Sequence, residues 1–308
     1  MGELSKWIPK TRFSVSDEDS IDIAHNFALC CYYTLQNVIG QAPSPRQLEV
    51  FAFTLIGCYT IYVILEQEGY NLVEFPLHKI VNFSGMYVIF DDIVDEGTGT
   101  KDAVIDEVGE MIKGEHHVPS LKLQNLHKCI LELKEHTSAI SLLYDSEVLA
   151  HSTEKVEPKT FDEDIFNRRH QISSYKSINS IRLLFDIICK VPEDLSCLSY
   201  NMGVVLQLID DMADYEEDVQ QGTYTQVYVH RNMYDDDDKL YSLIDVSLVT
   251  MPAPFRALFG MQHYFMFSDI LDRHLRGITE TGLSRVVTHI KREGCDCGVC
   301  NYIFQHDK

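Results

Sequence analysis

The sequence predicts an all-α fold in which one domain forms an antiparallel bundle of long helices around a central cavity. No run of residues alternates between apolar and polar with the period of a strand over any length. Several apolar stretches with helical period exceed about 20 residues, which is longer than the mean globular helix and typical of large bundles. No Pro-, Gly- or Ser-rich linker divides the 308 residues. We therefore expect residues 1–308 to form a single domain with a large core.

The expected helices follow the order of these apolar stretches. Gly40 ends the first one, because glycine favours the position after a helix. Val50–Leu65 is the most apolar run, but it contains Gly57 and two tyrosines and is too short to span a membrane, so we expect a buried central helix. Asp235–Asp238 lacks an apolar stripe and is expected in a solvated loop or in the first turn of the next helix. The helices are expected at Asp19–Ile39, Ser44–Glu68, Leu77–Glu96, Asp102–Lys113, Ser120–Ser152, Phe161–Cys189, Glu193–Gln221, Lys239–Thr250, Pro254–Arg276 and Gly282–Arg292.

Charge and cysteine content restrict the class of protein. The net charge of -21 argues against nucleic acid and anionic membrane surfaces as partners, since both require a basic patch. The nine cysteines are odd in number, and the chain begins without a hydrophobic signal region, so we expect a cytoplasmic protein without stable membrane insertion. Cys295, Cys297 and Cys300 have zinc-like spacing but would need His289 or His306 as a fourth ligand, so a zinc site is the less favoured interpretation.

Two acidic clusters are the most informative feature of the chain. Asp210, Asp214 and Asp218 stand at steps of four within QLIDDMADYEED and so share one helix face, and far upstream Asp91 and Asp95 lie one turn apart. Like charges about 4 Å apart repel by roughly 4 kcal/mol at a partly buried site, so they require a neutralising cation. Carboxylates without nearby His or Cys favour Mg²⁺, with Mn²⁺ as an alternative, and magnesium is usually shared with substrate phosphates. We therefore expect a phosphate-bearing ligand between the clusters; the alternative is a solvated helix face.

Each acidic cluster continues an apolar or aromatic stripe. Phe83 and Tyr87 lie on the stripe that leads to Asp91, and Gln207 lies on the face that leads to Asp210. An apolar stripe that ends in acids weakens the solvated alternative. It predicts a cavity with a charged mouth.

With DDIVD on one helix and QLIDDMADYEED on another, the sequence resembles the class I terpene synthases of the isoprenoid synthase superfamily. The resemblance implies the class I terpenoid synthase fold, in which the first motif binds two magnesium ions and the second binds a third. It further implies a lyase that ionises an allylic diphosphate, expected to be farnesyl or geranylgeranyl diphosphate, and cyclises the carbocation to a terpene. The positions that match the two motifs are Asp91, Asp92, Asp95, Asp210, Asp214 and Asp218. Among them Asp92 is expected as a supporting carboxylate.

The resemblance also implies basic residues that bind the diphosphate. Arg168 or Arg169 precedes the second motif by about the distance at which the family places a diphosphate-sensing arginine, and Lys176 lies on the face of Arg169 two turns later. Arg285, or the pair Lys291–Arg292, would cover the site from the C-terminal side, although the usual Arg-Tyr pair is absent. The alternative for Arg168 and Arg169 is a solvated pair.

Aromatic residues are expected to line the cavity, because ring faces attract a carbocation by roughly 2 kcal/mol or more in a dry site. Phe83 and Tyr87 are the first candidates, and Phe265 and Phe267 are weaker ones. For all of them an ordinary position in the core is the alternative.

Departures from the family patterns decide between reactions within the superfamily. Elongating isoprenyl diphosphate synthases carry a second diphosphate site with an arginine pair after the first motif, whereas here Lys101 follows without an arginine and Arg46 stands alone upstream. This favours cyclising one substrate over joining two. Glu217 stands where the family often has a basic residue beside the last acid. The alternatives are an isoprenyl diphosphate synthase or other prenyl-condensing transferase of the same fold, and a non-enzymatic helical binding protein; a homodimer, the substrate chain length and the product skeleton are left open.

Overall fold

A computed structural model describes residues 30–95, 101–114, 123–252 and 255, and the regular structure in this part is helical. Leu72 and Cys189 form an isolated β-bridge, and the described residues contain no strand. The prediction of an all-α protein is therefore confirmed. Residues 30–39 are helical, and the further elements are α3 (Pro45–Gln67), α4 (Leu77–Asp95), α5 (Lys101–Ile112), α6 (Gln124–Glu132), η2 (Lys134–His136), α7 (Thr137–Glu154), α8 (Glu163–Ile188), η3 (Pro192–Leu195), α9 (Ser196–Ala213), α10 (Tyr215–Gln220), α11 (Gln226–Arg231) and α12 (Asp238–Thr250).

The apolar helix α3 has well-defined ends. Ser44 Oγ accepts a hydrogen bond from the backbone N–H of Gln47 (3.2 Å), the Gln47 side chain accepts one from Ser44 N–H (2.7 Å), and Pro45 occupies the first turn. Gly69, with φ +83°, follows the last turn in the left-handed conformation that glycine favours. In the described residues α3 is the one helix long and apolar enough to cross a membrane, but 56% of that window is buried inside the molecule, as in the core helix of a soluble protein.

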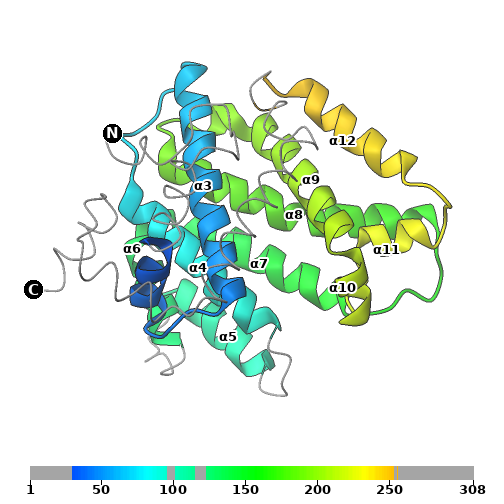
Figure 1. Cartoon of the computed structure of the whole chain (residues 1–308), viewed down its shortest axis with the longest axis horizontal. Coiled ribbons are helices and arrows are strands. Elements are labelled where there is room, and N and C mark those ends of the chain that lie inside the picture. The colour runs from blue at the N-terminus through cyan, green and yellow to red at the C-terminus, as the bar shows by residue number, and fades with distance from the viewer. Residues whose placement is uncertain (1–29, 96–100, 115–122, 253–254, 256–308) are drawn as a thin grey trace, which may run out of the picture.

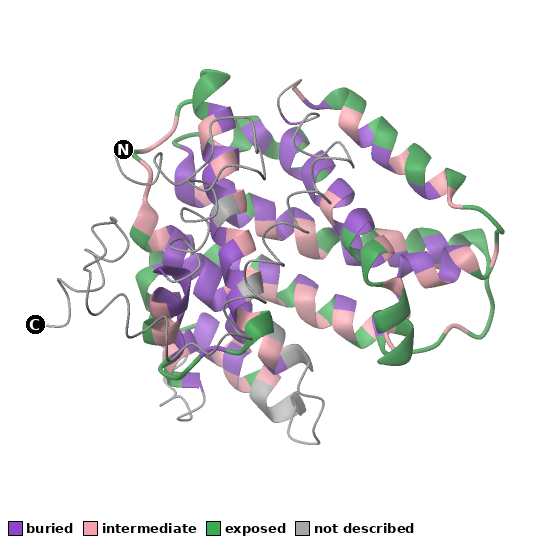
Figure 2. Ribbon diagram, in the orientation of Figure 1, coloured by how far each residue is buried: buried purple, intermediate pink, exposed green. Residues whose placement is uncertain are grey.

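The centre of the molecule is formed by α7, α8 and α9, which pack side by side with α8 in the middle (Figure 1). At the contact between α8 and α9, a Cβ atom added to Gly203 would lie 2.5 Å from the backbone nitrogen of Ile178, so glycine is what allows these helices to approach so closely. Figure 2 shows buried residues gathered on the inward faces of α3, α4, α8 and α9, while exposed residues follow the outer side of α12. The close pair α8 and α9 carries many of the residues of the site described below.

One predicted helix is divided because a side chain turns inward. The helix expected at Ser120–Ser152 consists, in its described part, of α6, the 3₁₀ turn η2 and α7. His136, at the end of η2, is buried, and its Nδ1 lies in a hydrogen bond of 2.8 Å with Asp186 on α8. This tertiary contact overrides the continuous helical pattern of the sequence.

The helix expected at Glu193–Gln221 is also divided, into η3, α9 and α10. Between α9 and α10, Asp214 N–H donates to Asp210 O (2.9 Å) and Asp218 N–H donates to Asp214 O (2.8 Å), so helical hydrogen bonds continue through the change of direction visible in Figure 1. The short helix α11 was not predicted, because six residues are too few to show a period. The helices expected at Pro254–Arg276 and Gly282–Arg292 lie outside the described residues, apart from Phe255.

Candidate functional site

The acids predicted to share one helix face remain neighbours across the junction of α9 and α10. Asp210 and Asp214 are exposed, and Asp218 is half-buried. Burial, followed by the negative charges of Asp214, Asp210 and Glu154, raises the pKa of the Asp218 carboxyl to about 7. The mutual repulsion expected from the spacing is therefore present in the fold.

Asp211, which follows Asp210 in the chain, is buried instead, with 4% of its surface exposed. Its two oxygens accept hydrogen bonds from Gln207 Nε2 and Gln226 Nε2, each at 2.8 Å. Burial and the charges of Glu154 and Asp210 hold the pKa of Asp211 well above its usual range, and the two hydrogen bonds oppose this rise. The two adjacent aspartates therefore have different environments, one at the surface and one in the interior.

Two glutamates of α7 that were not predicted from the sequence lie near these aspartates. Glu154 is buried and accepts a hydrogen bond from Ser173 Oγ (2.5 Å). Glu147 lies 3.8 Å from Lys176 Nζ and accepts a long hydrogen bond from the Tyr87 hydroxyl (3.5 Å). The spacing of seven residues, which places both glutamates on one face of α7, is the signal that could have revealed them. We refer to the following residues as the acidic cluster: Glu147, Glu154, Asp210, Asp211, Asp214 and Asp218.

Lys176 of α8 is the basic residue beside Glu147 in this cluster. The negative charge of Glu147 raises the pKa of Lys176 well above its usual value, against the opposing effect of burial, and Tyr87, Glu154 and Asp210 add to the rise. Lys176 is therefore protonated at neutral pH. The structure brings it to the predicted acids of α9 and α10, and its contact with a diphosphate stays a prediction.

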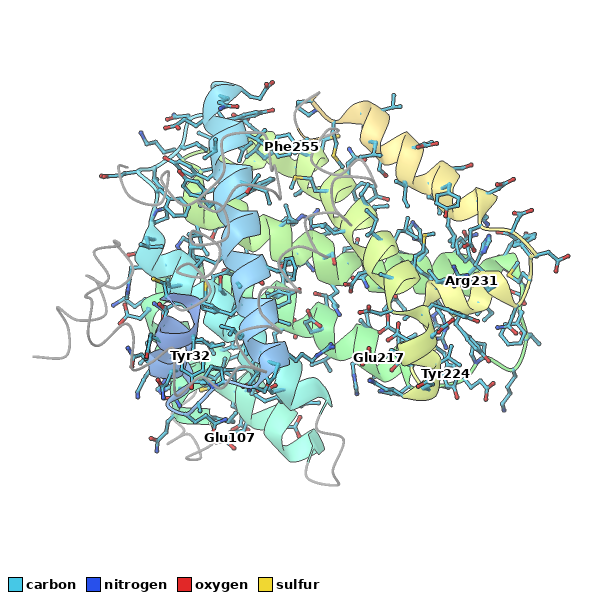
Figure 3. The ribbon with its side chains drawn as sticks, viewed as in Figure 1. Tyr32, Glu107, Glu217, Tyr224, Arg231 and Phe255 are labelled. Atoms are coloured by element: carbon cyan, nitrogen blue, oxygen red, sulfur yellow. The ribbon has the colours of Figure 1, made fainter. Side chains whose placement is uncertain are left out.

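Arg169 links the backbone that follows α7 to the backbone that follows α10. Only 5% of its surface is exposed, and its guanidinium donates hydrogen bonds to the carbonyls of Val156 (2.5 Å) and Tyr224. Figure 3 shows Tyr224 and Glu217 at the same end of the molecule, where the end of α7 meets α10. Arg168 is exposed on the same helix. Arg169 thus has a structural role in this fold, and diphosphate binding by either arginine stays a prediction.

The aromatic stripe of α4 leads from the core to the acidic cluster. Phe83 is 2% exposed, and its ring lies 6.0 Å from the ring of Tyr87 in an edge-to-face arrangement. Burial, followed by the charge of Glu147, raises the pKa of the Tyr87 hydroxyl, and the charge of Asp210 contributes as well. Tyr87 therefore marks the point where the apolar stripe meets the acids.

The first acidic motif lies at the C-terminal end of α4, one and two turns after Tyr87. The side chains of Asp91 and Asp95 are outside the described part of the structure. Asp92 accepts a hydrogen bond from Gln47 Nε2 of α3 (2.5 Å). The charge of Asp210 contributes to the raised pKa of Tyr87, one turn before Asp91 on α4. The predicted residues that lie wholly outside the described residues are Phe265, Phe267, Arg285, Lys291, Arg292, Cys295, Cys297 and Cys300.

The described side chains do not form a closed metal site. No group of three or more His, Cys, Asp or Glu residues among them is arranged to hold a metal ion, and Asp91 and Asp95 are not among the side chains described. Comparison of the chain with protein-family models, curated proteins and solved structures gave no match. The predicted magnesium site therefore stays a prediction, supported by the crowding of the acids.

Proposed function

We propose that the protein is a magnesium-dependent class I terpene synthase, which ionises a linear prenyl diphosphate and cyclises the resulting carbocation. The observation that carries this proposal is the gathering of Asp210, Asp214 and Glu154 about the half-buried Asp218. Burial and then these charges raise the pKa of Asp218, and Lys176 opposes the rise. Acids crowded in this way bind added cations, because each bound cation removes several repulsions at once.

The composition of the cluster fits a hard divalent cation. Its donor atoms are carboxylate oxygens, the ligands that Mg²⁺ and Mn²⁺ prefer. When bound, magnesium ions supply positive charge that stabilises the diphosphate as a leaving group. In this proposal the residues that would hold up to three ions are Asp91, Asp95, Asp210, Asp214 and Asp218, with Asp92 in support.

Lys176 would supply a fixed positive charge for the diphosphate. Its ammonium group can donate three hydrogen bonds, and its raised pKa keeps the proton on nitrogen when a phosphate oxygen approaches. Glu147, 3.8 Å away, holds the ammonium beside the cluster before substrate binds. The lysine would therefore orient the diphosphate relative to the acids.

The hydrocarbon chain of the substrate would lie along the aromatic stripe of α4. Tyr87 borders the acidic cluster and Phe83 lies one turn deeper, so a carbon that becomes positive after loss of the diphosphate would meet ring faces instead of water. Ring faces stabilise such a charge by about 2 kcal/mol in a dry site, and exclusion of water prevents early quenching to an alcohol. The cation then cyclises and loses a proton or captures water.

The proposal is tested by incubating purified protein singly with geranyl, farnesyl, geranylgeranyl and geranylfarnesyl diphosphates, with and without Mg²⁺, and analysing the extracts by gas chromatography with mass detection. We expect a magnesium-dependent cyclic hydrocarbon or alcohol from farnesyl or geranylgeranyl diphosphate. Product that forms only after addition of isopentenyl diphosphate would identify a prenyl transferase instead. No product in either case would favour a binding protein.

Matched variants connect this activity to the acids. Asp91→Asn should lower turnover by at least about 100-fold, since removal of one group that stabilises transition-state charge costs this much in other enzymes. Asp245→Asn, an exposed acid on α12, is the control and should leave turnover unchanged. Equal rates for the two variants would remove the first motif from the mechanism.

A further inference from the structure

A ring of side-chain hydrogen bonds, closed through the backbone of α8, lies behind the acidic end of α9. It starts on α8, crosses to α9, passes to α11 and returns to α8. Its bonds are Ser177 Oγ to Gln207 Oε1 (2.7 Å), Gln207 Nε2 to Asp211 Oδ1 (2.8 Å), Gln226 Nε2 to Asp211 Oδ2 (2.8 Å) and His170 Nδ1 to Gln226 Oε1 (2.5 Å). Ser174 Oγ lies 3.4 Å from the same His170 nitrogen, as a second acceptor for its proton.

The direction of each central bond is fixed by its partners. Both oxygens of Asp211 accept from glutamine NH₂ groups, so the glutamine carbonyl oxygens face Ser177 and His170. His170 must accordingly carry a proton on Nδ1. Two chains of hydrogen bonds, one from Ser177 through Gln207 and one from His170 through Gln226, therefore converge on the Asp211 carboxyl group. In each glutamine amide, an N–H donates one of these bonds and the carbonyl oxygen accepts another.

The central members of the ring are isolated from solvent. Gln207, Asp211 and Gln226 are 2%, 4% and 0% exposed. A buried polar group that loses its partner cannot bind water instead, so the bonds of this ring cannot be exchanged freely. The ring thus fixes the positions of α8, α9 and α11 relative to one another.

The bond between Asp211 and Gln226 closes the chain segment that carries the outer acids. Asp214 and Asp218 lie between these two residues, on the junction of α9 and α10 and on α10 itself. Near the far end of the same segment, Tyr224 N–H donates to Glu154 O (2.8 Å) and Tyr224 O accepts from Arg169. The segment is therefore held at both ends, and the acids on it are not free to separate.

We propose that Gln226 and Asp211 form a latch that positions Asp210, Asp214 and Asp218 to bind divalent cations together. This inference rests on the proposed function, because it assigns the latch to the same cation-binding acids. Gln226 and Asp211 are positioning residues in this proposal. They act through the path of the backbone between them and make no contact with substrate.

The test compares Gln226→Leu with the control Gln221→Leu in the full chain. Gln221 Nε2 also donates to a carboxylate, that of Glu217, at 2.8 Å, but both residues are exposed, Glu217 on α10 and Gln221 directly after it. Two quantities are measured: the Mg²⁺ concentration that gives half of the maximal rate, and the rise of Tm on addition of Mg²⁺, which requires no turnover. We expect Gln226→Leu to raise the half-maximal Mg²⁺ concentration about 10- to 100-fold and to reduce the Tm rise at a given Mg²⁺ concentration, as for other supports of metal ligands. Gln221→Leu should change neither.

A charge swap separates positioning from general damage to the fold. Gln226→Glu places a carboxylate against Asp211 and should behave as badly as Gln226→Leu. Adding Asp211→Asn restores a donor and an acceptor across the pair while Glu still accepts from His170, so the double variant should recover most of the Mg²⁺ response. A double variant no better than Gln226→Glu would overturn the proposal. So would a Gln226→Leu protein with a lower Tm but an unchanged Mg²⁺ response, since that result indicates a purely structural bond.

The two proposals fail in different ways. If wild-type protein gains Tm with Mg²⁺ and Gln226→Leu loses this gain, but no prenyl diphosphate reacts, the proposed enzyme is wrong and the latch is retained. If wild-type protein turns over and Gln226→Leu matches Gln221→Leu in both measurements, the latch alone is wrong. A wild-type protein with neither turnover nor a Tm response to Mg²⁺ would overturn both.

Discussion

Two dense runs of acid lie close together in the sequence, and the structure gives them opposite environments. In the run Asp235–Asp238, Asp237 accepts two hydrogen bonds from the guanidinium of Arg231, at 3.2 and 2.7 Å, and this contact lowers the pKa of its carboxyl. In the run that ends at Asp218, burial and neighbouring acids raise the pKa instead. The first run is thus balanced at Asp237 by Arg231, whereas the charges around Asp218 are mainly those of other acids. The comparison shows that the density of acids in a sequence does not identify a cation site until the nearby bases are known.

The largest expected difference between the two runs is in catalysis. Asp210→Asn should lower turnover by at least about 100-fold without lowering Tm, because it removes a proposed ligand and also relieves repulsion. Asp237→Asn should leave turnover unchanged below its melting temperature but reduce stability by about 1–3 kcal/mol, since it breaks a charged hydrogen-bonded pair. Turnover with Mg²⁺ and thermal unfolding measured on both proteins check this. Loss of turnover in Asp237→Asn alone would reverse the assignment of the two runs.

The next difference concerns the bases beside the acids. Lys176→Met should raise KM for the prenyl diphosphate about 10- to 100-fold, the effect of losing one charged hydrogen bond of roughly 1.5–3 kcal/mol. Arg231→Met, at the balanced run, should lower Tm without changing KM. Steady-state kinetics and melting curves on the two variants separate the roles. An unchanged KM in Lys176→Met would move diphosphate binding to Arg168 or to residues outside the described part of the chain.

A smaller effect tests whether Arg169 belongs to the scaffold or to the site. Arg169→Leu removes a buried guanidinium and leaves the carbonyls of Val156 and Tyr224 without this donor, so we expect a loss of about 1–3 kcal/mol in the free energy of unfolding. Arg168→Leu, on the exposed side of α8, should have little effect on stability. A raised KM with an unchanged Tm in Arg169→Leu would instead support the diphosphate contact implied by the family resemblance.

Much of the fold follows from apolar periodicity alone. The expected ends of α3, α4, α5, α8 and α12 agree with the structure within a few residues, because each is an independent apolar run with its own start or stop. The prediction of one continuous helix at Ser120–Ser152 was wrong for a physical reason: the contact between His136 and Asp186 depends on a partner about 50 residues away, which no local pattern contains. The six-residue helix α11 is below the length at which periodicity has meaning.

Some residues of the acidic cluster could also be predicted from local spacing, and others could not. Spacing in steps of four predicted that Asp210, Asp214 and Asp218 are neighbours, and the charges of the first two contribute to the raised pKa of Asp218, since helical hydrogen bonds continue through the junction. Glu154 was not found, because its importance comes from packing between α7 and α8. Asp211 was not among the predicted residues, and its burial becomes visible only with its partners Gln207 and Gln226.

The smallest effect, and the most direct measure of the charge imbalance, is the pH dependence of stability without metal. Asp218 has a pKa near 7 in the fold, above the value of about 4 for an unfolded aspartate, so its contribution to stability is complete below pH 4 and is lost as pH rises toward 7. Asp237 has a lowered pKa, so its contribution is present above pH 4 and is lost as pH falls below that value. In EDTA, Tm should therefore fall as pH rises from about 4.5 to 7.5.

Asp218→Asn should reduce the fall of Tm between about pH 4.5 and 7.5. Asp237→Asn should leave this fall unchanged but remove the loss of stability below about pH 4. The raised pKa of Asp211 leaves part of the slope in the Asp218→Asn protein. Adding Mg²⁺ to wild-type protein should flatten the slope in the same direction as Asp218→Asn, because a bound cation and a neutral side chain both remove the repulsion among these acids. A slope that is unchanged in Asp218→Asn would mean that the acids of α9 and α10 are already neutralised by the fold, as Asp237 is by Arg231, and the contrast between the two acidic runs would then disappear.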